Sequence, residues 1–383
     1  MRVALVYDRV NKFGGAERVL SVLHELFPNA PLYTLVYDPQ RAKWASKFKV
    51  IPTFVNALPF LRSKHELLAP IAPMAFETLN FDEFDLVISV TSSDAKSIIT
   101  KPHTVHLCYC LTPTRYFWSG EQEYQQDLKM RLLPQMIKKY LRTVDLLTST
   151  RPDHYIAISE AVKDRIRIYY QRDSSVVYPP IEDKFFTQKP EGSRSRQYYL
   201  VVSRLVPYKH VELVVKAFKK INRPLLVIGS GSELKHLKQI SGRNTKFLGQ
   251  VSDDQLIDYY RKAKAVIFPQ EEDYGLVPLE SQACGTPVLA YEKGGVLETV
   301  LSNKTGLFFA QQTPDSLVDC IEKFEKLNVD YSDCVTQAKK FSMDKFKKQF
   351  MSRIDQLLAA SPTLPHKSFL QTRIPPSPST TTT

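Results

Sequence analysis

The sequence predicts an α/β protein with two doubly wound parallel-sheet domains. Short β-rich runs alternate with amphipathic helical stretches in both halves of the 383-residue chain, and such alternation indicates parallel strands covered by helices. The alternation stops at residues 175–197, where adjacent prolines, charges and a Gly/Ser/Arg-rich run indicate a linker. The chain is also long for a single hydrophobic core. We therefore expect two domains whose strands present their carboxyl ends to one cleft.

The change in pattern also sets the expected domain bounds. The first domain covers residues 1–180 and the second covers 181–345, and one more helix follows over 346–360. Residues 361–383 are rich in Pro, Ser and Thr and contain few apolar side chains. Such a composition cannot bury enough apolar surface to fold, so we expect a disordered tail.

In the first half, five runs rich in apolar and β-branched residues predict strands. A glycine-containing turn after the first run leads into a helix that ends near Leu26, and a long basic helical region is expected from Glu121 to Leu147. The expected strands lie at 2–8, 32–37, 84–90, 104–110 and 154–159.

The second half repeats this pattern of strands and helices. Helices are expected from Lys209 and over residues 276–284, the latter with Pro278 in its first turn and Gly285 at its end. The expected strands lie at 198–204, 224–230, 245–250, 265–269 and 287–291.

Composition and charge narrow the classes of partner. A formal net charge of +12 and a pI near 9.3 favour an anionic partner: nucleic acid, anionic lipid or a phosphorylated substrate. No zinc-finger spacing or RNA-recognition signature is present, so no nucleic-acid partner is expected. The N-terminus is typical of a first strand and lacks the features of a signal peptide, which predicts a cytoplasmic protein. The five cysteines are expected to be buried free thiols, since Cys108 and Cys110 lack zinc or dithiol spacing.

The turn QEEDYG follows the expected strand at 265–269 and precedes the helix over 276–284. A helix that starts there offers unpaired N–H groups to a phosphate, and Gly275 lets an oxygen approach the backbone closely. Glu272 and Glu280 cannot bind phosphate themselves, but their carboxylates can accept hydrogen bonds from sugar hydroxyls. A nucleotide-sugar would suit this arrangement. Alternatively, Glu280 complements the helix dipole and Glu272 is solvated, and the spacing alone does not decide between the two.

The stretch EEDYGLVPLESQACGTPVLAYEKGGVLETV resembles the signature of the family-4 retaining glycosyltransferases, which have the GT-B fold. That signature is a Glu, a second Glu eight positions later, an A-x-G-x-P-V strand and a G-G-x-x-E turn. The resemblance implies that Glu272 holds hydroxyls of the donor sugar and Glu280 the nucleotide ribose. It also implies that the backbone of Gly275 and Leu276 contacts the diphosphate, and that the C-terminal helix crosses back.

Other segments extend the resemblance over residues 1–360. VVSRLVPYKHVELVVKAF is similar to the segment in which Arg204 and Lys209 would neutralise the leaving diphosphate without a metal. Val251 would lie beside the nucleotide base, and KFGGAERVL resembles a glycine loop in which Gly14 and Gly15 close on the donor phosphates. Without the resemblance, the basic turn and the glycine turn would be interpreted as solvated or purely structural.

One position departs from the pattern of the bacterial mannosyltransferase-like branch. Its second motif usually reads C-H-T-P, with the histidine on the donor sugar, whereas this chain has Leu111 after Cys110. His106 lies five positions upstream along the same expected strand and points to the opposite face, so we expect a structural role for it. Leu111 is expected to slow or redirect the reaction.

From the resemblance we expect a metal-independent retaining hexosyltransferase, with GDP-mannose or a UDP-hexose as the donor and no cofactor. No general base is nominated, and Asp253 and Asp254 are interpreted as a helix N-cap rather than metal ligands. The acceptor would be a glycan or a polyprenyl-linked sugar in the synthesis of cell-surface polysaccharide. Two alternatives remain open: a catalytically weak or non-enzymatic binder of nucleotide-sugars, and a sugar-nucleotide epimerase.

Two basic amphipathic stretches suggest that the protein binds its acceptor at a membrane surface. Residues 58–76 and 128–142 combine apolar side chains with Lys and Arg, which fits peripheral attachment to an anionic membrane at its inner face. Alternatively, these stretches are solvated helices that pack on their own domain.

Overall fold

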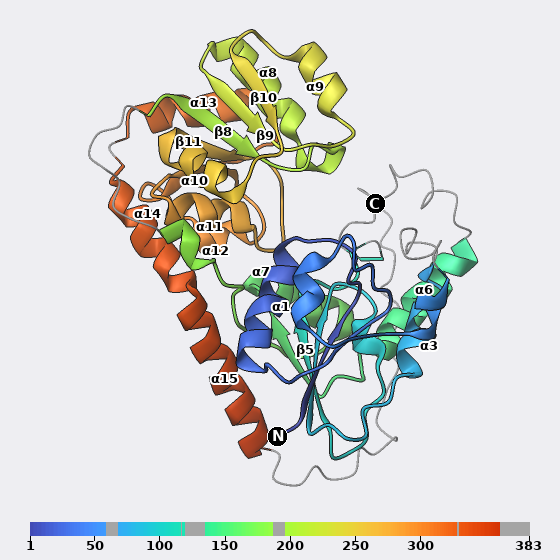
Figure 1. Cartoon of the computed structure of the whole chain (residues 1–383). Helices are drawn as coiled ribbons and strands as arrows, with labels where there is room; N and C mark the ends of the chain where they lie inside the picture. Colours follow the sequence, from blue (N-terminus) through green and yellow to red (C-terminus); the bar gives the residue numbers. More distant parts are fainter. Residues whose placement is uncertain (59–67, 116, 119–134, 187–195, 328, 361–383) are drawn as a thin grey trace. The chain divides into compact units, whose positions relative to one another are not determined.

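The computed structural model describes residues 1–58, 68–115, 117–118, 135–186, 196–327 and 329–360 (Figure 1). The expected tail over 361–383 lies outside the described residues. The chain divides into two compact units. The first contains residues 1–158, 162–177 and 350 onwards, and the second contains 159–161 and 178–349. The long helix α15 (Met343–Ala360) begins in the second unit, and its later residues belong to the first.

The first unit is built on a parallel sheet whose described strands follow the order β3-β2-β1-β4-β5-β6-β7. Strands β1, β4 and β5 are buried along their whole length, as expected for the centre of a sheet covered on both faces. The bounds are β1 Val3–Tyr7, β2 Leu32–Thr34, β3 Val50–Pro52, β4 Leu86–Thr91, β5 Val105–Cys110, β6 His154–Ala157 and β7 Ser175–Val176.

Helices and short turns connect these strands. Four apolar side chains of α1 recur at helical spacing and are buried: Val19, Leu20, Val22 and Leu23. The described α-helices are α1 Gly15–Leu26, α3 Ala72–Glu77, α6 Gln135–Thr148 and α7 Glu160–Arg165. The first two residues of α7 belong to the second unit, and a π-helical turn over Ile166–Tyr170 follows this helix. Short 3-10 turns cover Lys43–Lys47, Phe54–Ala57 and Ala95–Ser97.

The second unit contains a parallel sheet with the strand order β10-β9-β8-β11-β12-β13 among the described residues. Numbered along the chain, this is the order 3-2-1-4-5-6 of a Rossmann domain, with the reversal between β8 and β11. The bounds are β8 Tyr198–Val202, β9 Leu225–Ile228, β10 Thr245–Gly249, β11 Ala263–Phe268, β12 Val288–Tyr291 and β13 Gly306–Phe309.

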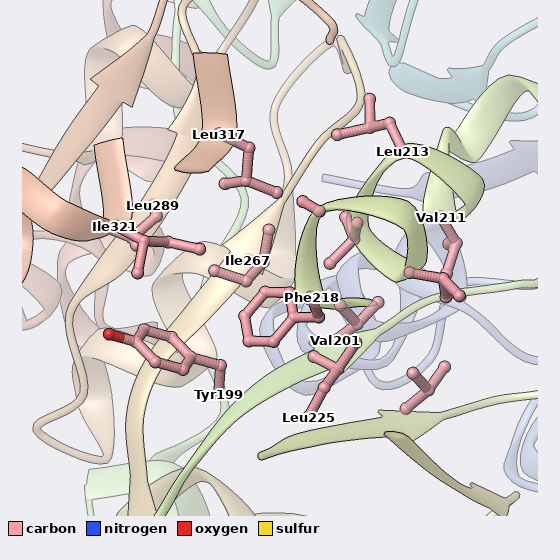
Figure 2. Packing of buried hydrophobic residues seen from close by; sticks show 14 of the residues in the cluster. Tyr199, Val201, Val211, Leu213, Phe218, Leu225, Ile267, Leu289, Leu317 and Ile321 are labelled. Atoms are coloured by element: carbon pink, nitrogen blue, oxygen red, sulfur yellow. The ribbon is translucent and has the colours of Figure 1, made fainter. Parts of the chain in front are cut away.

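Helices cover both faces of this second sheet. On one face, Phe218 of α8 and Leu317 of α13 pack on Val201 and Ile267 of the strands (Figure 2). On the other face, Phe268 joins a separate apolar cluster with side chains of α11 and α12. The helices are α8 Val211–Ile221, α9 Leu234–Ile240, α10 Asp253–Lys262, α11 Leu276–Ala283, α12 Val296–Thr299, α13 Pro314–Glu325 and α14 Tyr331–Ala338, with 3-10 turns over Asp183–Phe186, Pro207–Lys209 and Lys339–Phe341.

The prediction of two helix-covered parallel sheets is confirmed, and three strands are added to it. The sequence did not predict β3, β7 and β13, which are short and contain two to four residues. The interpretation of Asp253 and Asp254 as the N-cap of a helix was wrong. Ser252 caps α10, accepting from the Gln255 amide at 3.3 Å, and the two aspartates occupy the first turn.

A buried aspartate connects four segments of the first unit. One oxygen of Asp145 accepts hydrogen bonds from Lys96 Nζ and Thr114 Oγ1, both at 2.7 Å, and the other accepts from Trp118 Nε1 at 2.8 Å and the Tyr170 hydroxyl at 3.0 Å. Burial by itself would lower the pKa of Lys96, but the neighbouring carboxylates of Asp145 and, to a smaller extent, Asp94 more than reverse this and raise the pKa. The buried Lys96 ammonium therefore depends on the carboxylate of Asp145.

Asp145→Ala should be strongly destabilising, because it leaves the Lys96 ammonium buried without its paired carboxylate. We expect a loss of about 3–5 kcal/mol in the free energy of unfolding, measured by urea denaturation with circular dichroism. Asp82→Ala is the matched control: it removes the carboxylate that pairs with Lys101 at 2.5 Å, where both side chains are about half exposed. That variant should cost at most about 1 kcal/mol. Equal losses in the two variants would contradict this account.

Candidate functional site

The candidate site of the second unit lies at the carboxyl edge of its sheet, where the strand order reverses between β8 and β11. The segments that follow these neighbouring parallel strands begin at the same edge, and they lead to α8 on one face and α11 on the other. Arg204 and Lys209 lie between β8 and α8, and Glu272 and Gly275 lie between β11 and α11. Val251 follows β10 at this edge, immediately before the cap of α10.

Lys209 and Glu272 form an ion pair across this switch point, through Lys209 Nζ and Glu272 Oε1. The side chains are 11% and 24% exposed, so the pair lies at the surface of the unit but is largely shielded from water. Gln270 also donates its amide to Glu272 Oε1, at 3.3 Å. Each of these two charged residues was predicted from its own sequence motif. Their direct contact was not predicted, because they lie 63 positions apart in the sequence.

Tyr208 lies beside both predicted cations. Arg204 donates a hydrogen bond to the Tyr208 hydroxyl, and the aromatic ring lies 5.0 Å from Lys209 Nζ and 5.8 Å from the Arg204 guanidinium carbon. Arg204 is exposed, whereas Lys209 is buried at the end of a 3-10 turn. The ring therefore restrains two positive charges at the edge where an anion would bind.

Gly275 is the N-cap of α11 and adopts φ +83°, a left-handed conformation that disfavours other residues. Leu276 is the first residue of the helix. Because the cap is a glycine, it has no side chain that could accept hydrogen bonds from the first amides of the helix. The first turn of α11 therefore combines backbone donors with the positive end of the helix dipole, beside the Lys209–Glu272 pair.

Glu280 lies in the second turn of α11 and is almost completely buried, with an exposure of 4%. Its Oε2 accepts a hydrogen bond from the hydroxyl of Tyr260 in α10, at 3.0 Å. Glu280 therefore has a side-chain partner inside the domain, and Glu272, which the alternative interpretation left solvated, is paired with Lys209. The sequence did not single out Tyr260, because a tyrosine 20 positions before its partner has no recognisable pattern.

Two glycines press a neighbouring loop against the Glu272 turn. Gly294 has φ +79°, and a Cβ at this position would collide with the Glu272 carbonyl oxygen. The Gly295 amide donates to that same carbonyl at 2.8 Å. The glycine pair thus fixes the backbone that carries Glu272. Glu298, the last member of the motif, accepts from the backbone amides of Glu160 and Ala161 at 2.8 and 3.0 Å, which is a structural role.

In the first unit, Gly14 is the N-cap of α1 and Gly15 is its first residue, after the carboxyl end of β1. Glu17 lies in the first turn of this helix, is buried, and accepts from the Tyr7 hydroxyl at 2.7 Å. Burial raises the pKa of Glu17, and the hydrogen bond from Tyr7 opposes this effect. An acidic side chain therefore accompanies the predicted glycine loop, a feature that the sequence analysis did not single out.

The remaining positions of interest lie in β5 or directly after it. Leu111 directly follows the strand, half-buried, and its amide donates to the Thr91 carbonyl at 2.8 Å. His106 is fully buried within the strand, with its Nε2 2.8 Å from Ser89 Oγ. Cys108 and Cys110 are buried free thiols.

Neither a metal cluster nor a membrane-spanning helix occurs in the part of the chain that the structure describes. No three or more His, Cys, Asp or Glu side chains of these residues group so as to hold a metal ion. None of the helices formed by them is long and apolar enough to cross a bilayer.

Comparison with known proteins identifies the second unit. A family model described as glycosyl transferases group 1 matches residues 182–341. Over these residues the chain is similar to the group 1 glycosyl transferases. The match includes every site residue predicted in the second unit, and the recognition of a family-4 glycosyltransferase from the sequence is confirmed.

Among curated relatives, the O-antigen chain mannosyltransferase RfbU of Salmonella typhimurium is 25% identical over 297 residues, which are 74% of this chain and 80% of that protein. A GDP-mannose-dependent monoacylated alpha-(1-6)-phosphatidylinositol monomannoside mannosyltransferase of Corynebacterium glutamicum is 34% identical over 157 residues, 37% of this chain and 41% of that protein. The chain spans about half the length of the first curated relatives it matches.

Among solved structures, HepE of Anabaena in complex with UDP-glucose aligns with a TM-score of 0.67 at 18% identity. The alignment covers 93% of this chain and 100% of HepE. At this identity the likeness concerns the fold, and the predicted GT-B fold is confirmed.

Gly294→Ala should destabilise the protein and disturb Glu272 for two reasons. The added methyl group would collide with the Glu272 carbonyl oxygen, and alanine disfavours the φ of +79° at this position. We expect a loss of about 2 kcal/mol or more in the free energy of unfolding, measured in urea. Gly249→Ala is the control: Gly249 has φ +72°, but a Cβ there meets nothing within 4 Å. Its loss should be about 1 kcal/mol, from the backbone alone. If the two losses were equal, the close contact at Gly294 would have no energetic weight.

Proposed function

We propose that the protein transfers a hexose, with mannose favoured, from a nucleotide-diphosphate sugar to a hydroxyl of a glycan or polyprenyl-linked acceptor, with retention of configuration. The observation that carries the proposal is the Lys209–Glu272 pair beside the start of α11, in a domain of the group 1 glycosyl transferases. Cation and carboxylate lie together where a molecule with both phosphate and sugar hydroxyls would need them.

In this reaction the bond between the anomeric carbon and the diphosphate oxygen breaks, and its electron pair stays with the diphosphate. Lys209, Arg204 and the first amides of α11 would stabilise the negative charge that develops there. The acceptor oxygen forms the new bond to the anomeric carbon on the same face, and its proton passes to the leaving diphosphate. Glu272 would orient the sugar and Glu280 the ribose, so the carboxylates position rather than react.

The names of the relatives support this class of donor. The enzyme of Corynebacterium glutamicum is named as GDP-mannose-dependent, and HepE holds UDP-glucose. GDP-mannose is therefore the first donor to test and UDP-hexoses are the next. Leu111 cannot donate the hydrogen bond that a histidine would supply to the donor sugar, and such a loss corresponds to roughly a tenfold slower reaction. A leucine there would also favour a 6-deoxy sugar.

Two variants separate orientation of the sugar from charge stabilisation. Glu272→Ala should abolish transfer while GDP still binds, because Lys209 remains for the phosphates. Lys209→Ala should lower the transfer rate at least ~100-fold, as for loss of one preorganised charged group. Rates are measured with radiolabelled GDP-mannose and UDP-hexoses, with and without EDTA, and GDP affinity by calorimetry.

Glu322→Ala, which removes an exposed glutamate of α13, is the control and should match the wild type in both measurements. Strict dependence on an added divalent metal would contradict the charge role of Lys209. Nucleotide binding without any transfer, hydrolysis or epimer formation would favour a non-enzymatic binder, whereas epimer formation would favour an epimerase.

We also propose that the enzyme works in the cytoplasm at the inner face of the membrane. Of the two basic amphipathic stretches predicted to attach it, residues 59–67 and 128–134 lie outside the described residues. The described part includes α6, on which Met136, Tyr140 and Leu147 recur on one side with exposures of 85%, 52% and 53%. Lys138 and Lys139 lie on the same helix. Apolar side chains next to lysines suit the surface of an anionic bilayer.

Replacing Lys138 and Lys139 by Glu should weaken attachment to the membrane. Each lysine near an anionic surface contributes about 1 kcal/mol, so the double charge reversal should lower binding by at least tenfold. Sedimentation with phosphatidylglycerol vesicles at low salt measures the bound fraction. The control reverses Lys235 and Lys238, two exposed lysines of α9, and changes the net charge equally. Equal losses in both variants, or no wild-type binding, would refute a specific role of α6.

A further inference from the structure

Tyr260 of α10 is fully buried, and its hydroxyl is directed at one of the two carboxylates of the proposed nucleotide site. It donates to Glu280 Oε2 at 3.0 Å, and Glu280 is itself 4% exposed. A glutamate side chain has three rotatable bonds, so a fixed donor on one oxygen restricts the direction of the whole carboxylate. A buried carboxylate also needs such a donor, since an unsatisfied charge would be costly.

Tyr260 is held in place from several sides. Its ring lies 6.4 Å from that of Phe185, and its carbonyl accepts from Thr286 Oγ1 at 2.6 Å. Thr286 belongs to the turn between α11 and β12, and its hydroxyl accepts from Arg196 at 2.8 Å. Arg196 also donates to the carbonyls of Ala263 and Gly285, at 2.7 and 2.8 Å. These contacts connect α10, the start of β11 and the end of α11 around one tyrosine.

We propose that Tyr260 is a positioning residue that aims Glu280 at the nucleotide ribose, and that this bond sets the preference for ribonucleotide over deoxyribonucleotide donors. The proposal rests on the proposed function, in which Glu280 accepts hydrogen bonds from the ribose hydroxyls. A carboxylate that keeps its direction before the donor arrives loses no rotamer freedom on binding. A freely rotating one would bind both kinds of nucleotide similarly.

The test compares Tyr260→Phe with the wild type in the binding of GDP and UDP and of their 2′-deoxy and 3′-deoxy analogues, measured by calorimetry. The wild type should bind the ribonucleotides more tightly. Tyr260→Phe should lose about tenfold in affinity for them, on the scale of one hydrogen bond to a charged group, and change little for the analogues. The discrimination ratio is the decisive readout, because a general loss of structure would weaken all ligands equally.

Tyr199→Phe is a matched control. Tyr199 is equally buried in the same unit, and its hydroxyl donates to Glu325 at 3.2 Å (Figure 2 shows Tyr199 in the core). That variant also removes a tyrosine hydroxyl that donates to a glutamate, but it should leave the ratio of ribonucleotide to deoxyribonucleotide affinity unchanged. Combining Tyr260→Phe with Glu280→Gln should add little to the loss caused by Glu280→Gln alone, because both act on one interaction.

Thr286→Val loosens Tyr260 without touching its hydroxyl and serves if Tyr260→Phe does not fold. It should lower the discrimination ratio, whereas Thr286→Ser should retain it. Three outcomes would overturn this inference but not the proposed function. They are an unchanged ratio in Tyr260→Phe, an equal weakening of all nucleotides in that variant, and a wild type that shows no preference for ribonucleotides. A wild-type protein that binds neither GDP nor UDP would overturn the proposed donor class and the inference with it.

Discussion

The parallel pairing of β8 with β11 is the constraint on which the candidate site depends. Val266 lies opposite Leu200 in this pair, so both strands end at the same edge of the sheet. Because the chain reverses its direction of winding there, the segments after the two strands lead to opposite faces. Lys209 and Glu272 can therefore meet although 63 positions separate them. A change of register between these two strands would separate the charges whatever the sequence of the loops.

Two pairs of side chains at that edge differ in their exposure to solvent: Lys209 with Glu272, and Tyr260 with Glu280. In the proposed function a ligand would open the Lys209–Glu272 pair, with a phosphate replacing the partner of Lys209 and a sugar hydroxyl replacing the partner of Glu272. Tyr260 and Glu280 are different, since both lie almost fully inside the protein and the carboxylate keeps its donor. The proposed site would thus combine an ion pair that a ligand can replace with one carboxylate of fixed direction. This is the pairing of adaptability and preorganisation that a bound nucleotide-sugar would require.

Much of the fold followed from the sequence because long, strongly apolar strands such as β4 and β5 and a well-marked helix such as α11 carry their own signals. The start of α11 near Leu276 was predicted with Pro278 in its first turn, because the backbone preference of proline is local. Strands β3, β7 and β13 were missed because they are short and depend on a neighbouring strand rather than on their own pattern. The cap of α10 was misplaced by one residue, since serine and aspartate are similarly good caps.

For the site, resemblance pointed to individual residues but not to their contacts. Glu272, Glu280, Arg204 and Lys209 could be named because they lie in short motifs. Tyr208, Tyr260 and Gln270 act on those residues through bonds that only the folded chain brings together. The ligand-binding roles of all the predicted site residues remain predictions, as does the effect of Leu111.

The buried Asp145 cluster also determines what can be observed in solution. The chain has two tryptophans, and both lie in the first unit: Trp44, and Trp118 with its indole bonded to Asp145. Trp118 also stacks on Tyr169 at 5.2 Å and lies 5.3 Å from the Arg142 guanidinium carbon, so its emission should be sensitive to this cluster. The second unit contains no tryptophan and therefore does not contribute to the indole fluorescence. Intrinsic emission therefore follows one unit alone, and its comparison with circular dichroism of the whole chain separates the unfolding of the two.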